Sequence, residues 1–187
     1  ALDEALCTHF PGLLTPPLDF ILTLLDSYAL PVSQRPALWG LKPQEAPDER
    51  QQNLENMSEI LTCLGDRLGY QPAGQNPVDW YAPEGKLEYR YHIMSSSIIS
   101  RHVFSPPGLP TGRYAIVLPG SRSNLLTYRL NRDPRLAQAA EGWKFIKFRH
   151  LRRLAERCDL SAKNWADLLN EDPLQWKEVV QTSLFQV

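Results

Sequence analysis

The stretch YAIVLPGSRSNLLTYRLNRDPRLAQAAEGWKFIKFR, residues 114–149, carries the pattern that decides the fold. It begins with five apolar residues, Tyr114–Leu118, a length and composition typical of a strand that is covered on both faces. Pro119-Gly120-Ser121 ends this strand. Ser121 or Ser123 can then cap the helix that follows.

The rest of the stretch predicts a helix and a second strand. Apolar residues recur at helical spacing from Leu125 to Leu130, Pro134 interrupts the helix, and Leu136–Ala140 continues it. Trp143–Arg149 is again strand-like. A strand, a helix and a strand with short connections predict a right-handed parallel crossover.

Three more elements are predicted upstream of this crossover. A helix begins at Pro47, carries an apolar stripe from Leu54 to Leu68, and stops at Gly69. Leu87–Met94 alternates strictly between apolar and polar residues, which is typical of a half-buried strand. After a serine turn, Ile98–Phe104 is predicted as another strand.

The remaining segments extend this core. Thr15-Pro16-Pro17 predicts the start of a helix that Pro31 ends. Residues 31–47 hold four prolines and are expected to form a loop pinned to the core by Trp39 and Leu41, and residues 71–77 are expected to form a turn. We expect one domain over 1–187: a helical N-terminal extension (1–46), an α/β core (47–150) and C-terminal helices (151–187), the last starting at Asp172-Pro173 and containing Trp176 and Val179.

The predicted order from Pro47 to Arg149 is α-β-β-β-α-β, in a fold of the α/β or α+β class with a central mixed sheet of about four strands and flanking helices. Over about a hundred residues this order resembles the core of the PD-(D/E)XK endonuclease-like fold. The resemblance rests on element order alone. It implies a nuclease-like core whose function must be argued from its own residues.

Nucleases of that fold place an acid near the second core strand and an acid-x-Lys on the third, where the carboxylates hold a divalent metal. The predicted strands 98–104 and 114–118 contain no acid, so the motif is degenerate or absent there. The literal matches lie upstream: Asp79, followed by Glu84-Gly85-Lys86 or by Glu88-Tyr89-Arg90. Asp79, Glu84, Lys86 and Glu88 are thus weak catalytic candidates, and Mg²⁺ is implied only for an active nuclease.

Charge is strongly segregated along the chain although the formal net charge is −1. Residues 1–85 carry a net −8, residues 86–157 a net +10 and residues 158–187 a net −3. Such segregation indicates either contact with a polyanion or neutralisation of one segment by another within the fold.

Two groups of residues in the basic segment are candidates for binding nucleic acid or phosphate. The first is the loop between strand and helix, where free N–H groups and an arginine fork favour an anion, although an ordinary turn with a helix cap has the same pattern. The second is a run of bases interleaved with aromatic residues, which could neutralise phosphates or simply be the wet side of packed elements. The candidates are Ser121, Arg122, Ser123, Asn124, Arg129, Arg132, Lys147, Arg149, Arg152 and Arg153.

The sequence gives little support for a metal site, a disulfide framework or a membrane span. The four histidines show no HxH or HExxH spacing and the three cysteines show no CxxC pair, so neither a metal site nor a disulfide framework is predicted. Cysteine usage of this kind fits a reducing compartment, and we expect a cytoplasmic protein. The longest apolar run, Phe20–Leu25, is far short of a membrane span.

The sequence therefore predicts a nucleic-acid-associated binding module with a nuclease-like core that lacks clear catalytic residues. DNA and RNA are both possible partners at this point. The alternative is a protein-interaction or scaffold domain of a larger complex, which the five tryptophans and the proline-rich segment favour.

Overall fold

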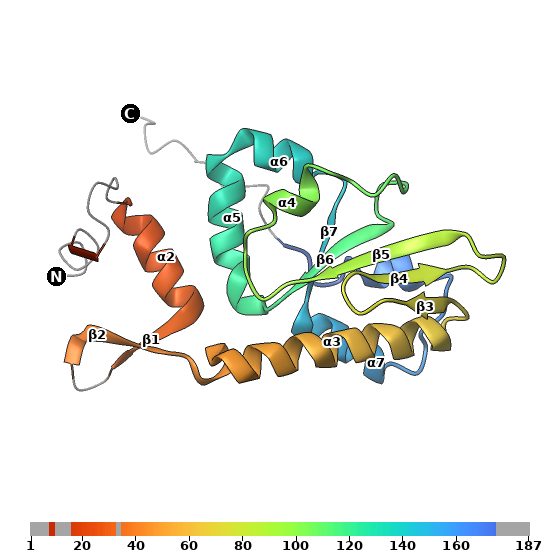
Figure 1. Cartoon of the computed structure of the whole chain (residues 1–187), viewed down its shortest axis with the longest axis horizontal. Helices are drawn as coiled ribbons and strands as arrows, with labels where there is room; N and C mark the ends of the chain where they lie inside the picture. Colours follow the sequence, from red (N-terminus) through yellow and green to blue (C-terminus); the bar gives the residue numbers. More distant parts are fainter. Residues whose placement is uncertain (1–7, 10–15, 33–34, 175–187) are drawn as a thin grey trace, which may run out of the picture.

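The computed structural model describes residues 8–9, 16–32 and 35–174, and its centre is a five-stranded mixed sheet (Figure 1). In spatial order the strands are β3 (Gln71–Ala73), β4 (Val78–Tyr81), β5 (Leu87–Ile93), β6 (Tyr114–Leu118) and β7 (Lys144–Lys147). β3, β4 and β5 are antiparallel neighbours, whereas β5, β6 and β7 are parallel. The α+β class with flanking helices is thus confirmed, with one strand more than expected.

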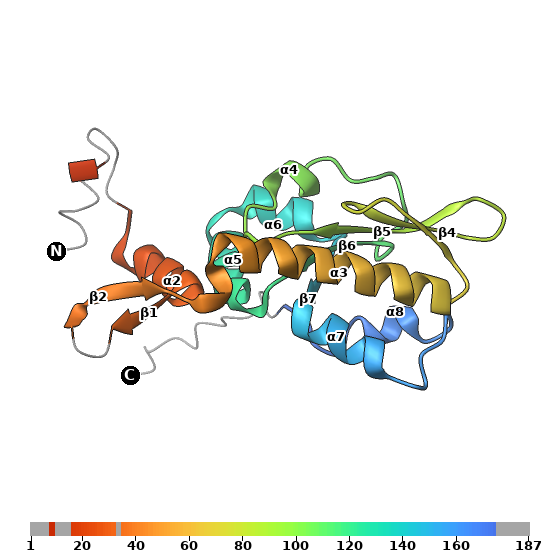
Figure 2. The ribbon, with the colours of Figure 1, turned by 60° about the horizontal axis from the view of Figure 1, so that its bottom comes forward.

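Helices cover both faces of this sheet (Figure 2). The buried residues of α3 (Pro47–Arg67), α7 (Phe148–Glu156) and α8 (Trp165–Leu168) pack against one face. Those of α4 (Ser100–Val103), α5 (Ser123–Arg132) and α6 (Pro134–Ala140) pack against the other. None of the helices in the described ranges is long and apolar enough to cross a membrane.

The central position of β6 follows from its sequence. All five of its residues are buried. Ala115 and Val117 belong to the core beside α3, while Tyr114, Ile116 and Leu118 belong to the core beside α5. Because successive side chains of a strand point to opposite faces, only a continuous apolar run can fill both cores.

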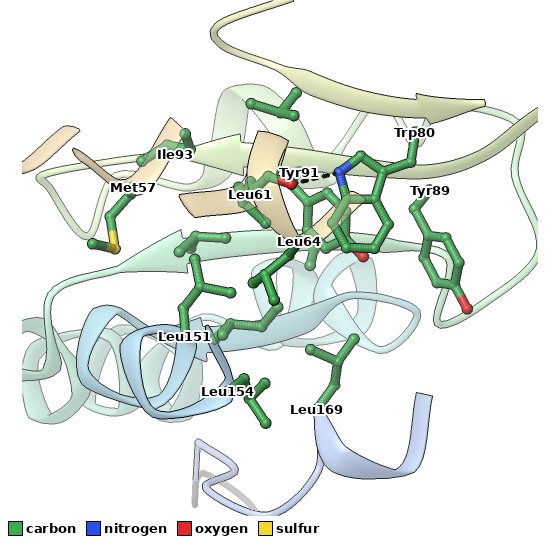
Figure 3. Packing of buried hydrophobic residues seen from close by; sticks show 14 of the residues in the cluster. Met57, Leu61, Leu64, Trp80, Tyr89, Tyr91, Ile93, Leu151, Leu154 and Leu169 are labelled. Carbon is green, nitrogen blue, oxygen red and sulfur yellow. Dashed lines mark hydrogen bonds between the residues drawn. The ribbon is translucent and has the colours of Figure 1, made fainter. Parts of the chain in front are cut away.

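Aromatic rings dominate the core beneath α3 (Figure 3). Trp80 is fully buried and its Nε1 donates to the Leu61 carbonyl at 3.1 Å. The Nε1 of Trp165 donates to the hydroxyl of Tyr91 at 2.8 Å, and burial raises the pKa of Tyr91 well above its usual value. Trp80, Trp165 and Tyr91 therefore each have a partner for the polar atom of the buried ring.

The N-terminal part forms a projection beside this body (Figures 1 and 2). α2 (Leu18–Tyr28) packs on α5, with the rings of Phe20 and Tyr128 5.6 Å apart. It leads into a hairpin of β1 (Ala29–Val32) and β2 (Arg35–Leu41), and the short 3₁₀ helix η1 (Pro43–Glu45) then joins α3.

Two of the predicted strands need correction. Ile98–Phe104 contains α4 rather than a strand, because Ile99 and Val103, four residues apart, are both buried while Ile98 and Phe104 are exposed. The strand predicted over Trp143–Arg149 ends at Lys147, where α7 begins. The element order from α3 onward is therefore α-β-β-β-α-β-α-α-β before α7.

Strands also occur where loops were expected. Residues 31–47 include part of the hairpin, and Trp39 and Leu41 are exposed instead of pinning it to the core. Residues 71–77 include β3, whose Pro72 is tolerated because an edge strand has a free side. The helix predicted from Asp172 onward lies outside the described residues beyond position 174, as does the predicted cap Thr15.

Candidate anion-binding pocket and basic cluster

A pocket of about 240 Å³ lies where the parallel strands end. In open sheets with parallel strands, ligands bind outside the carboxyl ends of those strands. Residues following β5, β6 and β7 all reach this pocket, together with residues from η1 and the first turns of α3. The lining consists of Gln44, Glu45, Arg50, Asn53, Ser95, Pro119, Gly120, Ser121, Phe148, Arg149 and Arg152.

The loop predicted to bind phosphate forms one wall, but its arginine points inward. Gly120–Arg122 is a short 3₁₀ turn, η2, and Arg122 is completely buried. Its guanidinium pairs with the Glu45 carboxylate and donates to the backbone oxygens of Ser95 at 2.9 Å and Ser27 at 2.8 Å. The structure thus assigns Arg122 to the interior, where it ties α2 and η1 to the strand ends.

The other loop residues divide between two pockets. Ser121 lines the pocket described above, whereas Ser123 and Asn124 line a second one of about 440 Å³. The hydroxyl oxygen of Ser123 is buried, and no hydrogen-bond partner for it lies within the described ranges. Lys147 and Arg149 also line the second pocket, so Arg149 lies between the two.

Lys147, Arg149, Arg152 and Arg153 form what we call the α7 basic cluster. Three of them share the carboxylate of Asp172: the distances from it are 2.5 Å to Lys147, 3.0 Å to Arg149 and 3.5 Å to Arg153. Arg149, and then Lys147, holds the pKa of Asp172 well below its usual range.

The α7 basic cluster keeps a surplus of positive charge. Within the described residues, Arg152 donates to the neutral amide oxygen of Asn53, at 2.7 Å. The side chains of Arg149 and Arg153 are 66% and 62% exposed despite their contact with Asp172. In the described structure, the cluster therefore has four bases and one carboxylate partner, Asp172. The side chains of Arg149 and Arg153 remain largely exposed.

The remaining predicted bases lie elsewhere. Arg129 donates to the Ser97 carbonyl at 2.5 Å, and Arg132 donates to the Tyr128 hydroxyl at 2.8 Å. Both line a different depression, between α2 and α5. The structure therefore brings together Ser121, Lys147, Arg149, Arg152 and Arg153, but not Arg129 and Arg132.

The predicted catalytic candidates lie on β4, on β5 and in the turn between them, and bases hold two of them, Asp79 and Glu88. Asp79 of β4 accepts two hydrogen bonds from Arg90 of β5, at 2.7 and 2.6 Å. Glu88 lies between Lys86 at 3.1 Å and Arg113 at 3.2 Å, and Glu84 is exposed in the turn before β5. Within the described ranges no three His, Cys, Asp or Glu side chains are placed to hold a metal ion.

The side chains of two histidines, His92 of β5 and His102 of α4, lie close together. The rings of His92 and His102 are 4.4 Å apart, and the ring of Trp143 lies 5.7 Å from His92. Burial, and then repulsion from His102 and Arg90, lowers the pKa of His92 to about 4. Both rings are therefore neutral near pH 7, because the pKa of His102 is lowered as well.

Sequence reasoning missed the residues that complete the pocket. Glu45, Arg50 and Asn53 come from the acidic first segment, far from the basic loop in the chain. Glu45 stands between two prolines and gives no sign that it pairs with Arg122. The available signal was the opposite charge of the segments, which indicates pairing without identifying partners.

Comparison of the chain with protein-family models, with curated protein sequences and with solved structures found no match.

Proposed function

We propose that this protein is a nucleic-acid-binding module that holds phosphate groups on the α7 basic cluster and the adjoining pocket. The observation that carries the proposal is the surplus of exposed bases at the edge where the parallel strands end. Arginine suits this role because its planar fork can donate two hydrogen bonds to one phosphate.

The start of α7 supports the same role. Its N-cap residue, Lys147, makes no side-chain hydrogen bond to the first turn of this nine-residue helix. The first N–H groups of a helix lack partners within the helix and carry partial positive charge. Arg149 follows at the second helical position, so backbone and side-chain donors are available together.

Binding of a labelled duplex and a labelled single strand, both with hydroxyl ends, tests this proposal. Fluorescence anisotropy at about 50 mM salt should detect complexes that weaken at about 200 mM. The triple variant Arg149→Ala, Arg152→Ala, Arg153→Ala should lose at least about tenfold in affinity, since each lost phosphate contact removes electrostatic free energy.

A matched control separates the cluster from charge in general. Arg101, Arg135 and Lys163 are exposed bases outside the cluster and the pocket. Replacing these three by alanine changes the net charge equally and should leave affinity within about twofold. Equal losses in the two triple variants, or no binding at low salt, would contradict the proposal.

One observation favours the alternative function, a protein-interaction domain. Several large apolar side chains of the projecting hairpin and α2 are exposed, among them Leu18 at 62%, Leu41 at 60% and Leu30 at 53%. Clustered exposed apolar residues commonly mark interaction surfaces. Sedimentation velocity should then reveal self-association that Leu30→Ser with Leu41→Ser abolishes, whereas a monomer at all concentrations would oppose self-association.

A further inference from the structure

We propose that the pocket at the strand ends binds a phosphate monoester, the dianionic group found at a phosphorylated nucleic-acid end and in a nucleoside monophosphate. This inference rests on the proposed function, to which it adds a ligand class. It concerns the pocket lined by Arg50, whereas phosphodiesters of a continuing strand would contact the exposed bases of the α7 basic cluster.

The charge inside the pocket favours a dianion. Arg50, Arg149 and Arg152 line it. Its one lining carboxylate, Glu45, is already paired with the buried Arg122. Because a phosphate monoester carries about −1.5 to −2 charges at pH 7 and an internal phosphodiester only one, the monoester complements this surplus better.

Arg50 supplies a donor that the fold leaves unused. Its Nε is buried, and the part of the chain that the structure describes offers it no hydrogen-bond partner. An unmade hydrogen bond at a buried polar atom costs free energy that a ligand can recover. Arg50 also lines the pocket, so a phosphate bound there would meet a guanidinium that still has an unused donor.

Asn53 holds a second arginine at the pocket wall. Its side-chain nitrogen donates to the Glu49 carbonyl at 2.8 Å, and its side-chain oxygen accepts from Arg152 at 2.7 Å. Both ends of the amide are therefore engaged. Arg152 is positioned by a neutral group, so its positive charge remains available to a ligand.

The size and the apolar wall of the pocket fit a strand end. A volume of about 240 Å³ is below the ~300–1,000 Å³ usual for drug-sized ligands. This volume suits a phosphate with its sugar. Phe148 and Pro119 supply apolar surface on which the sugar can rest.

The test compares oligonucleotides that differ only in the terminal group. The protein should bind a 5′-phosphorylated or a 3′-phosphorylated single strand at least about tenfold more tightly than the same strand with hydroxyl ends, equivalent to about 1.4 kcal/mol. Adenosine monophosphate should compete with the phosphorylated strand, whereas adenosine should not. Equal affinity for phosphorylated and hydroxyl ends would overturn the inference.

Two single variants locate the effect. Arg50→Gln removes a pocket arginine, and Arg153→Gln removes a base of the α7 basic cluster that does not line the pocket. Arg50→Gln should reduce the ratio of affinities for the phosphorylated and the hydroxyl end to near one. Arg153→Gln should weaken the binding of both strands equally and leave this ratio unchanged. Arg152→Gln serves as a second pocket variant should Arg50→Gln unfold, as judged by its melting temperature.

The outcomes distinguish this inference from the proposed function. Salt-dependent binding of both strands without a preference for phosphate would leave the function standing and refute the inference. Binding of adenosine monophosphate that requires Arg50, with no binding of either strand, would support the pocket ligand and refute the nucleic-acid function.

Discussion

Arg122 lies in a basic loop, yet its side chain stabilises the interior of the protein. It is fully buried, it pairs with Glu45, and its guanidinium carbon lies 3.5 Å from the centre of the Tyr28 ring. An arginine that makes this many internal contacts stabilises the junction of α2, η1 and the strand ends. Its neighbour Ser121 faces the pocket.

Replacing Glu45 by glutamine should destabilise the protein by about 3–5 kcal/mol, because it leaves a buried guanidinium without its counter-charge. Urea unfolding followed by tryptophan fluorescence measures this loss. Glu49→Gln, an exposed change in the first turn of α3, is the control and should cost less than about 0.5 kcal/mol. A similar loss in both variants would mean that the buried pair is not the cause.

His92 gives the folded protein a dependence on pH. Its pKa of about 4 lies below the 6.5 of an unfolded chain, so the unfolded chain binds the proton more tightly. The contribution of neutral His92 to the free energy of unfolding is therefore complete above pH 6.5 and is lost as the pH falls toward 4. Besides His102 and Arg90, the facing group is Asp79, which opposes the shift.

Between pH 7 and pH 5 the unfolding free energy should consequently fall by about 1–2 kcal/mol through His92, after allowance for its partial exposure. The variant His92→Gln should lose this component. His9→Gln, at an exposed position, should retain it. Chemical denaturation at the two pH values measures the difference, and an unchanged pH dependence in His92→Gln would contradict the assignment.

At the scale of elements, α3 approaches the sheet so closely that one position requires glycine. A Cβ on Gly65 would lie 2.8 Å from Pro72 of β3 and 2.8 Å from the Trp80 ring of β4. Alanine usually stabilises a helix by about 1 kcal/mol over glycine. Here Gly65→Ala should instead destabilise by about 1–3 kcal/mol, because α3 must move away from a packed core.

Thermal unfolding of Gly65→Ala checks this expectation against Glu59→Ala, an exposed substitution on the same helix. The control should change the melting temperature by no more than a few degrees. A stabilised Gly65→Ala protein would show that α3 can shift freely over the sheet.

The same elements show what sequence reasoning can recover. The apolar run of β6 and the apolar stripe of α3 predicted these elements correctly. In both, the buried positions recur with the spacing of the element. Ile98–Phe104 misled because apolar residues at both ends hid the four-residue spacing of Ile99 and Val103. β3 and the hairpin escaped because their stability comes from pairing with neighbours, which local sequence does not report.

At the scale of the whole molecule, both interpretations of the segregated charge apply to different bases. Acids of the first segment neutralise Arg90 and Arg122, and acids of the last segment contact Lys147, Arg149 and Arg157. The α7 basic cluster retains a surplus of positive charge because it has four bases and Asp172 supplies one carboxylate. The sequence indicated the bases of the α7 basic cluster, but the pocket residues Glu45, Arg50 and Asn53 come from the acidic segment and depended on contacts across the fold.

This partial neutralisation sets the salt dependence of nucleic-acid binding. With about three to four bases free to replace counterions, the logarithm of duplex affinity should fall with the logarithm of salt concentration at a slope of about −3 to −4. Affinity should therefore drop about a hundredfold between 50 and 200 mM salt. Anisotropy titrations across this range measure the slope. A slope of about −8 or steeper would show that the full net +10 of residues 86–157 reaches the phosphates, in conflict with the observed ion pairs.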